Sequence, residues 1–413
     1  MGQVSLWNGE TRPIAAAVDR SRVVSFLSET ARIKSYSGDE RDIARFMAER
    51  MRGLGLEVAL QEVRPNRFNA IGVWRGAGGG PSFMFNGHMD TNPAGMGWTK
   101  DPLGGVVDRR FVYGIGVSNM KAANAAAFHA VEALKASGFV PAGDLILAYV
   151  VGELQGGIGT LKLIESGVRA DAFVVGEPTD LSAVTCHAAS FVFRIHTFGK
   201  TRHLSKREEG VDAIEKMLKV LARLKRMTFN GAKTARDRGI NRINVGVMRA
   251  GVSREYHEWR AAQLADVCTI KAAGRIAPGQ TLEGAMADLR RMLRDLGRED
   301  RDFRAEVELV DDERVYMPPF EVDPSAPVVR ALAAAHREVT GTRPKIGAVA
   351  PYKFYGSDAA HLAQAGMQGL VYGPGGKYNT MPDERVDIAD LVNAAKVYAL
   401  TMARMTAPGA LAR

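Results

Sequence analysis

A histidine that follows an apolar segment is the first residue whose type and position suggest chemistry. Residues 83–90 read Phe-Met-Phe-Asn-Gly-His-Met-Asp, so the apolar run ends at His88 and a carboxylate follows at Asp90. The run predicts a buried strand. We interpret His88 as a metal ligand at the strand end, and Asp90 as the group that accepts the other ring N–H and fixes the tautomer. The alternative is a buried histidine with satisfied hydrogen bonds and no ligand role.

Two further acids follow apolar runs that are typical of buried strands. Glu177 comes directly after residues 172–176, at the loop edge where α/β proteins form their sites, and we interpret it as a metal ligand. Glu153 follows residues 144–151, and its apolar neighbours can raise its pKa into the range useful for a general base. The alternatives are a solvated turn acid for Glu177 and a strand-end acid without a catalytic role for Glu153.

A series of short motifs surrounds these residues and extends along the chain. The motifs are Gly-His-Met-Asp-Thr (87–91), Gly-Ile-Gly-Val-Ser-Asn-Met-Lys (114–121), Gly-Glu-Leu-Gln-Gly-Gly-Ile-Gly-Thr (152–160), Val-Gly-Glu-Pro-Thr (175–179), Gly-Lys-Thr-Arg-His (199–203), Gly-Ser-Asp (356–358), Gly-Pro-Gly-Gly (373–376) and Tyr-Asn-Thr-Met-Pro-Asp-Glu (378–384). In order and spacing, the series resembles the family of acetylornithine deacetylases, succinyl-diaminopimelate desuccinylases, aminoacylases and carboxypeptidase G. The resemblance covers essentially the whole chain.

The resemblance implies two metal ions that share a bridging carboxylate and a water. One ion takes a histidine at the position of His88 and an acid at that of Glu177. The other takes the second acid of a Glu-Glu pair and a late histidine, and both ions share an aspartate at the position of Asn119. A glutamate at the position of Glu153 acts as general base on the bridging water.

The chain departs from that pattern at Asn119, Leu154 and Asn379. A carboxylate can bridge two cations, whereas asparagine offers one neutral oxygen and an NH₂ group that only donates. Leu154 has no lone pair, and Asn379 replaces an imidazole with a weak neutral oxygen at the same metal position. We therefore predict at most one divalent metal ion per chain, zinc or manganese, or none. The predicted ligands are His88, Asn119 and Glu177.

Four further positions resemble groups that bind substrate in this family. His203 resembles the histidine of an inserted domain that reaches the partner subunit's active site and stabilises the oxyanion, and the alternative is a surface histidine after a turn. Arg275, three residues before Pro278, resembles an arginine that binds a substrate carboxylate. The glycine loop around Gly375 is expected to present backbone N–H groups to the substrate, and Asn379 to add a polar contact.

Alternating apolar runs and helical patterns predict an α/β protein with a central mixed sheet and helices on both faces. Between residues 187 and 312 the pattern changes to β-α-β-β-α-β, which predicts a ferredoxin-like lid or dimerisation domain. The catalytic domain is therefore expected to be discontinuous, with residues 1–186 and 313–413. Helical patterns cover residues 19–54, 120–137, 160–166, 210–226, 282–296, 326–340 and 388–405.

The composition is that of an ordinary globular protein, with 46% hydrophobic and 24% charged residues. The net charge is +9, but zinc-finger spacing, RNA-binding motifs and long basic tracts are missing, so we expect no nucleic-acid partner. No apolar run is long enough to cross a bilayer and no secretory signal is found, so we expect no membrane association. Two cysteines, Cys186 and Cys268, fit a reducing compartment, and we expect the cytoplasm.

These residues together predict a hydrolase that acts on an uncommon C–N bond, amide or amine, of a small carboxylate-bearing molecule, with Glu153 as general base. Because a second ion normally helps to hold the substrate, we expect something other than an ordinary acetylated amino acid. The resemblance implies an amino-substituted aromatic acid as one example, since the family includes such aminohydrolases. The alternatives are a metal-independent acid–base enzyme on the same scaffold and a small-molecule-binding protein without activity. The chain is expected to form a homodimer through the lid domain.

Overall fold

The computed structural model describes residues 10–257, 261–311 and 314–411. They form two compact units, each with its own hydrophobic core. Among the described residues, every helix is too short or too polar to span a membrane. The larger unit comprises Met1–Cys186, Phe320–Tyr352 and Ser357–Arg413, and the smaller unit comprises His187–Pro319 and Lys353–Gly356.

The larger unit is built on an eight-stranded mixed sheet. Four adjacent strands at its centre run parallel to one another, and the two strands at one edge are antiparallel to their neighbours. The central strands are apolar on both faces, which is the pattern of strands covered by helices on both sides. In order across the sheet, the strands are β1 (Glu57–Arg64), β2 (Arg67–Trp74), β5 (Leu145–Val150), β3 (Phe83–His88), β6 (Ala172–Val175), β15 (Gln368–Val371), β7 (Ala183–Val184) and β14 (Ile346–Gly347).

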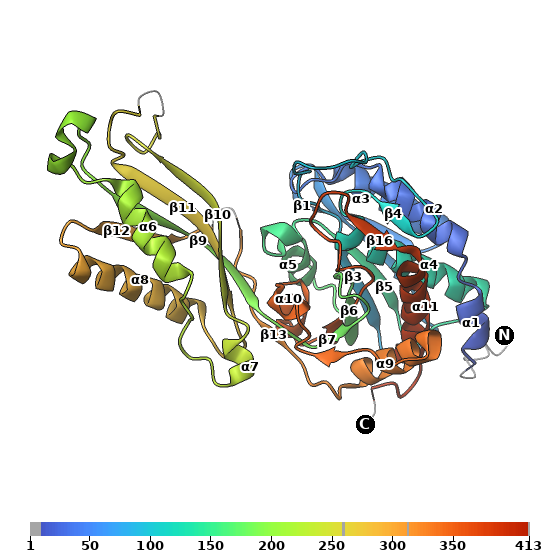
Figure 1. Ribbon diagram of the computed structural model, residues 1–413. Helices are drawn as coiled ribbons and strands as arrows, with labels where there is room; N and C mark the ends of the chain where they lie inside the picture. The colour runs from blue at the N-terminus through green and yellow to red at the C-terminus, as the bar shows by residue number, and fades with distance from the viewer. Residues whose placement is uncertain (1–9, 258–260, 312–313, 412–413) are drawn as a thin grey trace. The chain divides into compact units, whose positions relative to one another are not determined.

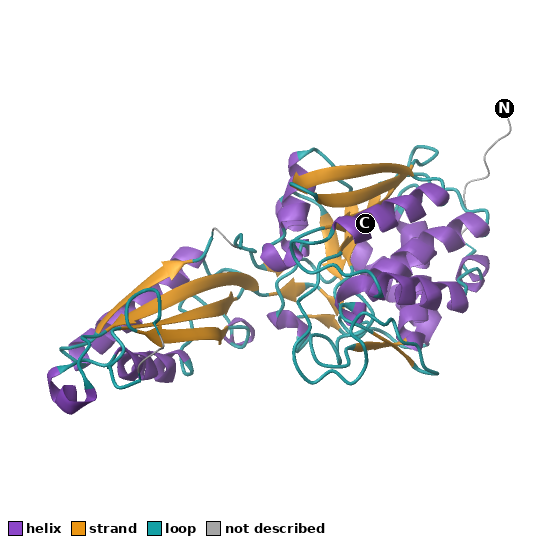
Figure 2. Cartoon of the chain, turned by 90° about the horizontal axis from the view of Figure 1, so that it is seen from above, coloured by secondary structure: helices purple, strands orange, loops and turns teal. Residues whose placement is uncertain are grey.

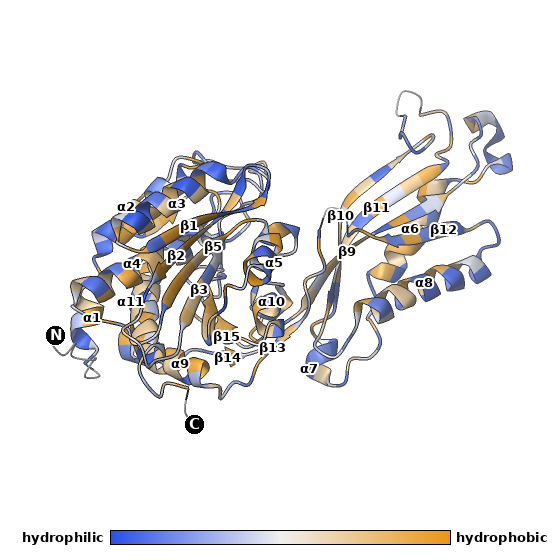
Figure 3. Ribbon diagram, turned by 180° about the vertical axis from the view of Figure 1, so that it is seen from behind, coloured by the Kyte–Doolittle hydropathy of each residue, from blue (hydrophilic) through white to orange (hydrophobic). Residues whose placement is uncertain are grey.

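Helices lie on both faces of this sheet, as Figures 1 and 3 show from opposite sides. On one face, α4 (Ala122–Ala136) packs against α11 (Ile388–Met405), and the alanine-rich sequence of α4 permits a close approach. On the other face lie α5 (Ile158–Glu165) and α10 (Ala359–Gln364). The predicted α/β class with a mixed sheet is confirmed. The remaining helices of this unit are α1 (Arg12–Ala16), α2 (Arg20–Ala31), α3 (Arg41–Gly53) and α9 (Pro327–Thr340).

The predicted helical stretch over residues 19–54 is interrupted in the structure. Helix α2 begins after Asp19, whose side chain accepts hydrogen bonds from two N–H groups of the first turn, and it ends at Ala31. The chain then runs beside the end of β3, where the N–H of Thr91 donates to the carbonyl of Ser35. Apolar spacing alone did not reveal the break, because it depends on this contact with a distant strand.

The smaller unit is a four-stranded antiparallel sheet with two long helices, α6 and α8, that contact each other and the sheet (Figure 2). The strand order across the sheet is β10-β11-β9-β12, as in ferredoxin-like domains. Helix α6 begins at the capping residue Asp212 and buries Met217, Val220 and Leu224 on one face. Along the chain the elements are β9 (Ala189–Phe198), α6 (Ala213–Leu224), α7 (Ala235–Arg238), β10 (Arg242–Gly251), β11 (Val267–Ile276), α8 (Leu282–Glu299) and β12 (Arg304–Leu309).

The register of the central parallel strands determines which loops meet. His88 of β3 lies opposite Val150 of β5, and Asn86 of β3 lies opposite Val175 of β6. The loops that follow these three strands therefore leave the sheet at the same edge, the edge where α/β proteins bind ligands. Short elements elsewhere are β4 (Phe111–Tyr113), β8 (Cys186–His187), β13 (Phe320–Glu321), β16 (Arg385–Asp387) and the short helical turns η1 (Val117–Lys121), η2 (Glu153–Gln155), η3 (Leu204–Glu209) and η4 (Tyr352–Phe354).

A buried ion pair connects the start of α3 to the start of β2 and, through Arg67, to the turn after β5. Glu40 is completely buried, and the Nε atom of Arg67 donates to its Oε2 atom at 2.7 Å. A terminal nitrogen of Arg67 also donates to the side-chain oxygen of Gln155 at 2.6 Å. The pair therefore supports the turn η2, at whose first position Glu153 stands.

We expect Glu40→Ala to lower the free energy of unfolding by about 3–5 kcal/mol, because it leaves the Arg67 charge buried without its partner. Urea denaturation followed by circular dichroism measures the change. The control is Glu57→Ala, since Glu57 pairs with Arg75 where both side chains are exposed. Removal of this pair should lower the free energy of unfolding by only about 0–1 kcal/mol. Equal losses for the two variants would contradict a structural role of the buried pair.

Candidate metal centre

Three neighbouring parallel strands bring His88, Glu153 and Glu177 together. His88 is the last residue of β3, Glu153 follows β5 at the start of η2, and Glu177 follows β6. One ligand atom from each of the three side chains lies within 4.8 Å of the others, and all three residues are buried. Among residues 10–257, 261–311 and 314–411, no other three histidine, cysteine or acidic side chains come as close. This cluster is therefore the candidate metal centre.

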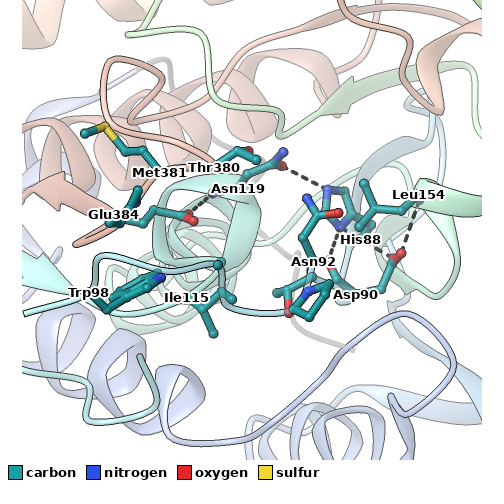
Figure 4. A pocket seen from close by; sticks show the side chains of 15 residues that line it. His88, Asp90, Asn92, Trp98, Ile115, Asn119, Leu154, Thr380, Met381 and Glu384 are labelled. Carbon is teal, nitrogen blue, oxygen red and sulfur yellow. Dashed lines mark hydrogen bonds and ion pairs between the residues drawn. The ribbon is translucent and has the colours of Figure 1, made fainter. Parts of the chain in front are cut away.

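The ring of His88 is oriented by the main chain of Asp90. Its Nδ1 atom lies 2.9 Å from the Asp90 carbonyl oxygen, whereas the Asp90 carboxylate is 3.5 Å away. Its Nε2 atom lies 3.0 Å from the side-chain oxygen of Asn119 and 3.6 Å from Oε1 of Glu177 (Figure 4). If Nδ1–H donates to the carbonyl, the lone pair of Nε2 faces Asn119 and Glu177 and is available to a cation.

The carboxylate of Asp90 holds the turn that carries Glu153. It accepts hydrogen bonds from the main-chain N–H groups of Glu153 and Leu154, both at 3.1 Å, and from the Ser37 hydroxyl at 2.9 Å. The sequence analysis assigned this side chain to the imidazole of His88. In the structure the carbonyl of the same residue takes that position, because the chain turns after β3 and brings the carboxylate against η2.

Negative charge exceeds positive charge in this buried cluster. Burial opposes protonation of His88, but the carboxylates of Glu177 and Asp90 outweigh it and raise the pKa of His88 to about 9. Burial also raises the pKa of Glu177 to about 8, although His88 acts in the opposite direction. The Oε1 atom of Glu177 is buried and accepts no hydrogen bond. The imidazole of His88 and the unsatisfied oxygen of Glu177, with the carboxylate of Glu153 beside them, fit a single divalent cation.

The residues at the positions that the family resemblance assigns to a second ion do not fit a metal. Asn119 lies in η1, where its own N–H and that of Ser118 donate to Oε1 of Glu384, and its side-chain oxygen points to His88. The side chain of Leu154 lines an adjacent cavity, and the N–H of Asn379 donates to the carbonyl of Gly376 at 3.4 Å. Apart from the His88 cluster, these positions offer neutral amides and an alkyl group, which cannot hold a second cation in place.

Asp358 is a further acid near this cluster, and the sequence analysis gave it no role. It precedes α10 and is fully buried, with one carboxylate oxygen bonded to the Thr160 hydroxyl and Oδ1 without a hydrogen-bond partner. Asn86 of β3 donates to the same hydroxyl oxygen at 3.0 Å. Burial and the charge of Glu153 raise the pKa of Asp358 to about 8. Its motif, Gly-Ser-Asp, was the only signal available in the sequence.

Two of the predicted site residues, His203 and Arg275, belong to the smaller unit. His203 is exposed and caps η3, where its Nδ1 atom accepts a hydrogen bond from the N–H of Ser205 at 3.2 Å. Within β11, the Nε atom of Arg275 donates to the carbonyl of Phe354 at 3.0 Å, and a terminal nitrogen donates to the Ser190 hydroxyl at 2.7 Å. Their roles toward a substrate therefore stay predictions.

The glycine loop around Gly375 lies against η1. The N–H of Gly376 donates to the Ser118 hydroxyl at 3.1 Å, and the N–H of Gly373 donates to the Thr179 hydroxyl at 3.1 Å. Gly375 has a φ of +73°, and a Cβ atom there would lie 2.5 Å from the Ser118 hydroxyl, so the position requires glycine. Two of the N–H groups that were expected to face a substrate therefore bind side chains of this unit.

Comparison with known proteins assigns this arrangement to a family. Residues 84–404 match the sequence pattern of peptidase family M20/M25/M40. The chain belongs to this family. The match includes His88, Glu153 and Glu177, and the predicted family is confirmed.

Relatives of the chain are named as enzymes that cleave C–N bonds. It is 27% identical over 412 residues to the N-formyl-4-amino-5-aminomethyl-2-methylpyrimidine deformylase of Bacillus subtilis, covering 91% of each protein. It is also 27% identical to the acetylornithine deacetylase of Myxococcus xanthus, covering 89% of this chain and 90% of that one. The structure of the dipeptidase Dug1p from Saccharomyces cerevisiae aligns with a TM-score of 0.78 at 16% identity, over 97% of this chain and 99% of that one, and has the same fold. The prediction of a C–N hydrolase agrees with the names of these relatives.

We expect Asp90→Asn to weaken binding of Zn²⁺ by about 10- to 100-fold without unfolding the protein, since the amide cannot accept both N–H groups of η2. Competition with a chromophoric chelator measures the affinity. Asp39→Asn is the control, because Asp39 lies on the surface and pairs only with the exposed Lys34. An Asp90→Asn protein with unchanged zinc affinity would show that the anchoring of η2 does not matter for the centre.

Proposed function

We propose that the larger unit catalyses hydrolysis of an uncommon C–N bond, amide or amine, in a small carboxylate-bearing molecule, with at most one divalent metal ion. The observation that supports this proposal is the buried cluster in which His88, Glu153 and Glu177 converge, with Oε1 of Glu177 lacking a hydrogen bond. The names of the relatives support the class of reaction. The uncommon substrate follows from the loss of the second ion, which would otherwise help to hold an acylated amino acid.

In the proposed centre, His88, Glu177 and the side-chain oxygen of Asn119 hold the ion. This set of one imidazole, one carboxylate and one neutral oxygen suits Zn²⁺ or Mn²⁺. When bound, such an ion supplies a Lewis acid that lowers the pKa of water and stabilises developing negative charge. Asn119 has a single neutral acceptor oxygen and so cannot bridge to a neighbouring ion.

Glu153 is the proposed general base. It takes a proton from the attacking water and returns it to the leaving nitrogen, so that one carboxyl group serves both halves of the reaction. Its position depends on Asp90, whose carboxylate binds the N–H of Glu153 and thereby fixes the start of η2. Burial of Glu153 keeps bulk water from competing for the proton.

The smaller unit is proposed to act as a lid and dimerisation domain in a cytoplasmic homodimer. His203 would stabilise negative charge in the partner subunit's active site, and Arg275 would bind the substrate carboxylate, together with Asn379 and the Gly375 loop. Free cysteines at Cys186 and Cys268 are compatible with a reducing compartment.

Exposed apolar side chains support the choice of dimer surface. Strand β10 forms one edge of the smaller sheet, and Val247 and Met248 on it are 47% and 43% exposed. On α6, Leu218 is 56% exposed and Ile214 is 37% exposed. An unpaired sheet edge with apolar side chains is suited to pairing with a second copy.

We expect Glu153→Gln and Glu177→Gln to separate catalysis from metal binding. Glu153→Gln should keep the bound metal but lower kcat by about 10²- to 10⁴-fold, because the amide cannot accept a proton. Glu177→Gln should lose the metal, since it removes an anionic ligand. Elemental analysis gives metal per chain, and hydrolysis of N-formyl and N-acetyl amino acids and of aminobenzoates, with and without chelator, gives activity.

That experiment distinguishes a metal-dependent hydrolase from a metal-independent enzyme and from a binding protein without activity. About one ion per chain with chelator-sensitive turnover supports the proposal, and two ions per chain contradict it. Turnover that survives chelation but is lost in Glu153→Gln points instead to a metal-independent enzyme. Absence of turnover on every substrate, with ligand binding intact, points to a binding protein.

We expect the double substitution Leu218→Glu with Met248→Glu to convert the dimer into a monomer, because it places charges on both parts of the apolar surface. Size-exclusion chromatography with light scattering measures the mass. Val107→Glu is the control, since Val107 is similarly exposed but belongs to the larger unit. A dimer that persists in the double variant would place the interface elsewhere.

A further inference from the structure

A cavity of about 220 Å³ opens beside the metal centre, on the side of Asn119 and Leu154. Figure 4 shows Trp98, Ile115 and Met381 around it, together with His88. The Nε2 atom of His88 and the side-chain oxygen of Asn119, 3.0 Å apart, mark the place where the cavity meets the centre. A group in this cavity would therefore adjoin the bond that reacts there.

The walls of the cavity are largely apolar. Trp98, Ile115, Leu154 and Met381 contribute hydrocarbon or aromatic surface, and two prolines extend it. Leu154 stands at the position where the family resemblance places a carboxylate ligand of the second ion. The same substitution that removes a metal ligand therefore adds apolar surface next to the remaining centre.

The two acids in the lining, Asp90 and Glu384, already accept hydrogen bonds from main-chain N–H groups. Asp90 accepts the N–H groups of Glu153 and Leu154, as described above. Glu384 is buried, and its Oε1 atom accepts the N–H groups of Ser118 and Asn119 at 2.9 and 3.0 Å. Both carboxylates therefore serve the backbone and have little capacity to bind a cationic group in the cavity.

Apart from the proposed metal ion, the lining offers little that would bind an anion either. No lysine or arginine is among the described residues that line the cavity, and His88 is surrounded by carboxylates. The remaining polar groups are neutral, namely the side chains of Asn92, Asn119, Thr91 and Thr380. Apolar walls with a few neutral polar groups favour an uncharged occupant.

We propose that this cavity is a substrate subsite for an uncharged, flat ring attached next to the C–N bond that is cleaved. The inference rests on the proposed function, because it assigns the ring to the substrate of that reaction. A cavity of roughly 150 Å³ with apolar walls is enough to hold benzene, so this one has room for a substituted six-membered ring. The substrate carboxylate, if present, binds outside the cavity.

Ligand binding tests the subsite without any need for turnover. The probes are benzyl alcohol as an uncharged ring, benzoate as its anionic analogue and ethanol as the group without a ring, each titrated by calorimetry and by ligand-observed NMR. We expect benzyl alcohol to bind in the millimolar range and the other two probes to bind about tenfold more weakly or not at all. Benzoate that binds the metal-free protein as well as benzyl alcohol does would overturn the proposal.

A matched pair of methionine substitutions locates the binding. Met381→Glu places a charge in the lining at a residue that is 41% exposed, so the variant should fold, whereas Met96 is 95% exposed and does not line the cavity. We expect Met381→Glu to weaken the binding of benzyl alcohol by about tenfold, and Met96→Glu to change its affinity by no more than about twofold. Unchanged binding in Met381→Glu, or equal losses in both variants, overturns the assignment to this cavity.

Turnover separates this inference from the proposed function. If the chain hydrolyses formamides, N-formylbenzylamine should exceed N-formylmethylamine in kcat/KM by about tenfold or more, and Met381→Glu should abolish the difference. Hydrolysis without a preference for the ring supports the proposed function and overturns the subsite. Ring binding that Met381→Glu weakens, in a chain that hydrolyses nothing, shows that the cavity binds a ring but overturns the proposed function and, with it, the assignment of that ring to a substrate.

Discussion

A surplus of buried negative charge around a single imidazole is the constraint on which the rest of the structure depends. Glu153, Glu177 and Asp358 are brought out of water close to His88, which can supply one positive charge at most. Burying a carboxylate without a compensating charge or hydrogen bond costs free energy. In this cluster, Glu177 and Asp358 have raised pKa values, and each has an oxygen without a hydrogen bond. A divalent cation would relieve this cost, which connects the stability of the loop edge to the proposed chemistry.

The carboxylates at this edge divide into two groups with different tasks. Asp90 and Glu384 each accept hydrogen bonds from two main-chain N–H groups, and they hold the turns η2 and η1, respectively. Glu177 keeps an oxygen without a hydrogen bond, and Glu153 is presented at the first position of a fixed turn. The first group holds the backbone, and the second contains the carboxylates that are proposed to act on a metal, a water or a proton. As a result, the two carboxylates that line the adjacent cavity are both bound to main-chain N–H groups.

Much of the fold follows from local patterns. Apolar runs located β5 and β6 to within a residue or two, because burial on both faces leaves an unbroken run of apolar residues. Helix α11 has the bounds that its pattern predicts, because burial of one stripe leaves a helical period. The convergence of His88, Glu153 and Glu177 could also be predicted from the sequence, since each lies at or just after the end of a strand and neighbouring parallel strands end at the same edge of the sheet. The interruption between α2 and α3, the binding of Asp90 to η2 and the proximity of Asp358 were not, because each depends on a contact between distant segments.

The sequence by itself determined which atoms are available to bind a metal. Asparagine at positions 119 and 379 and leucine at position 154 offer neither a carboxylate nor an imidazole whatever the fold does, since side-chain chemistry does not change with packing. Only the tertiary structure decided how the remaining groups are used. Whether a carboxylate faces an N–H group, an imidazole or no partner depends on strand register and on turns that bring remote residues within hydrogen-bonding distance, and these distances are not encoded in any local pattern.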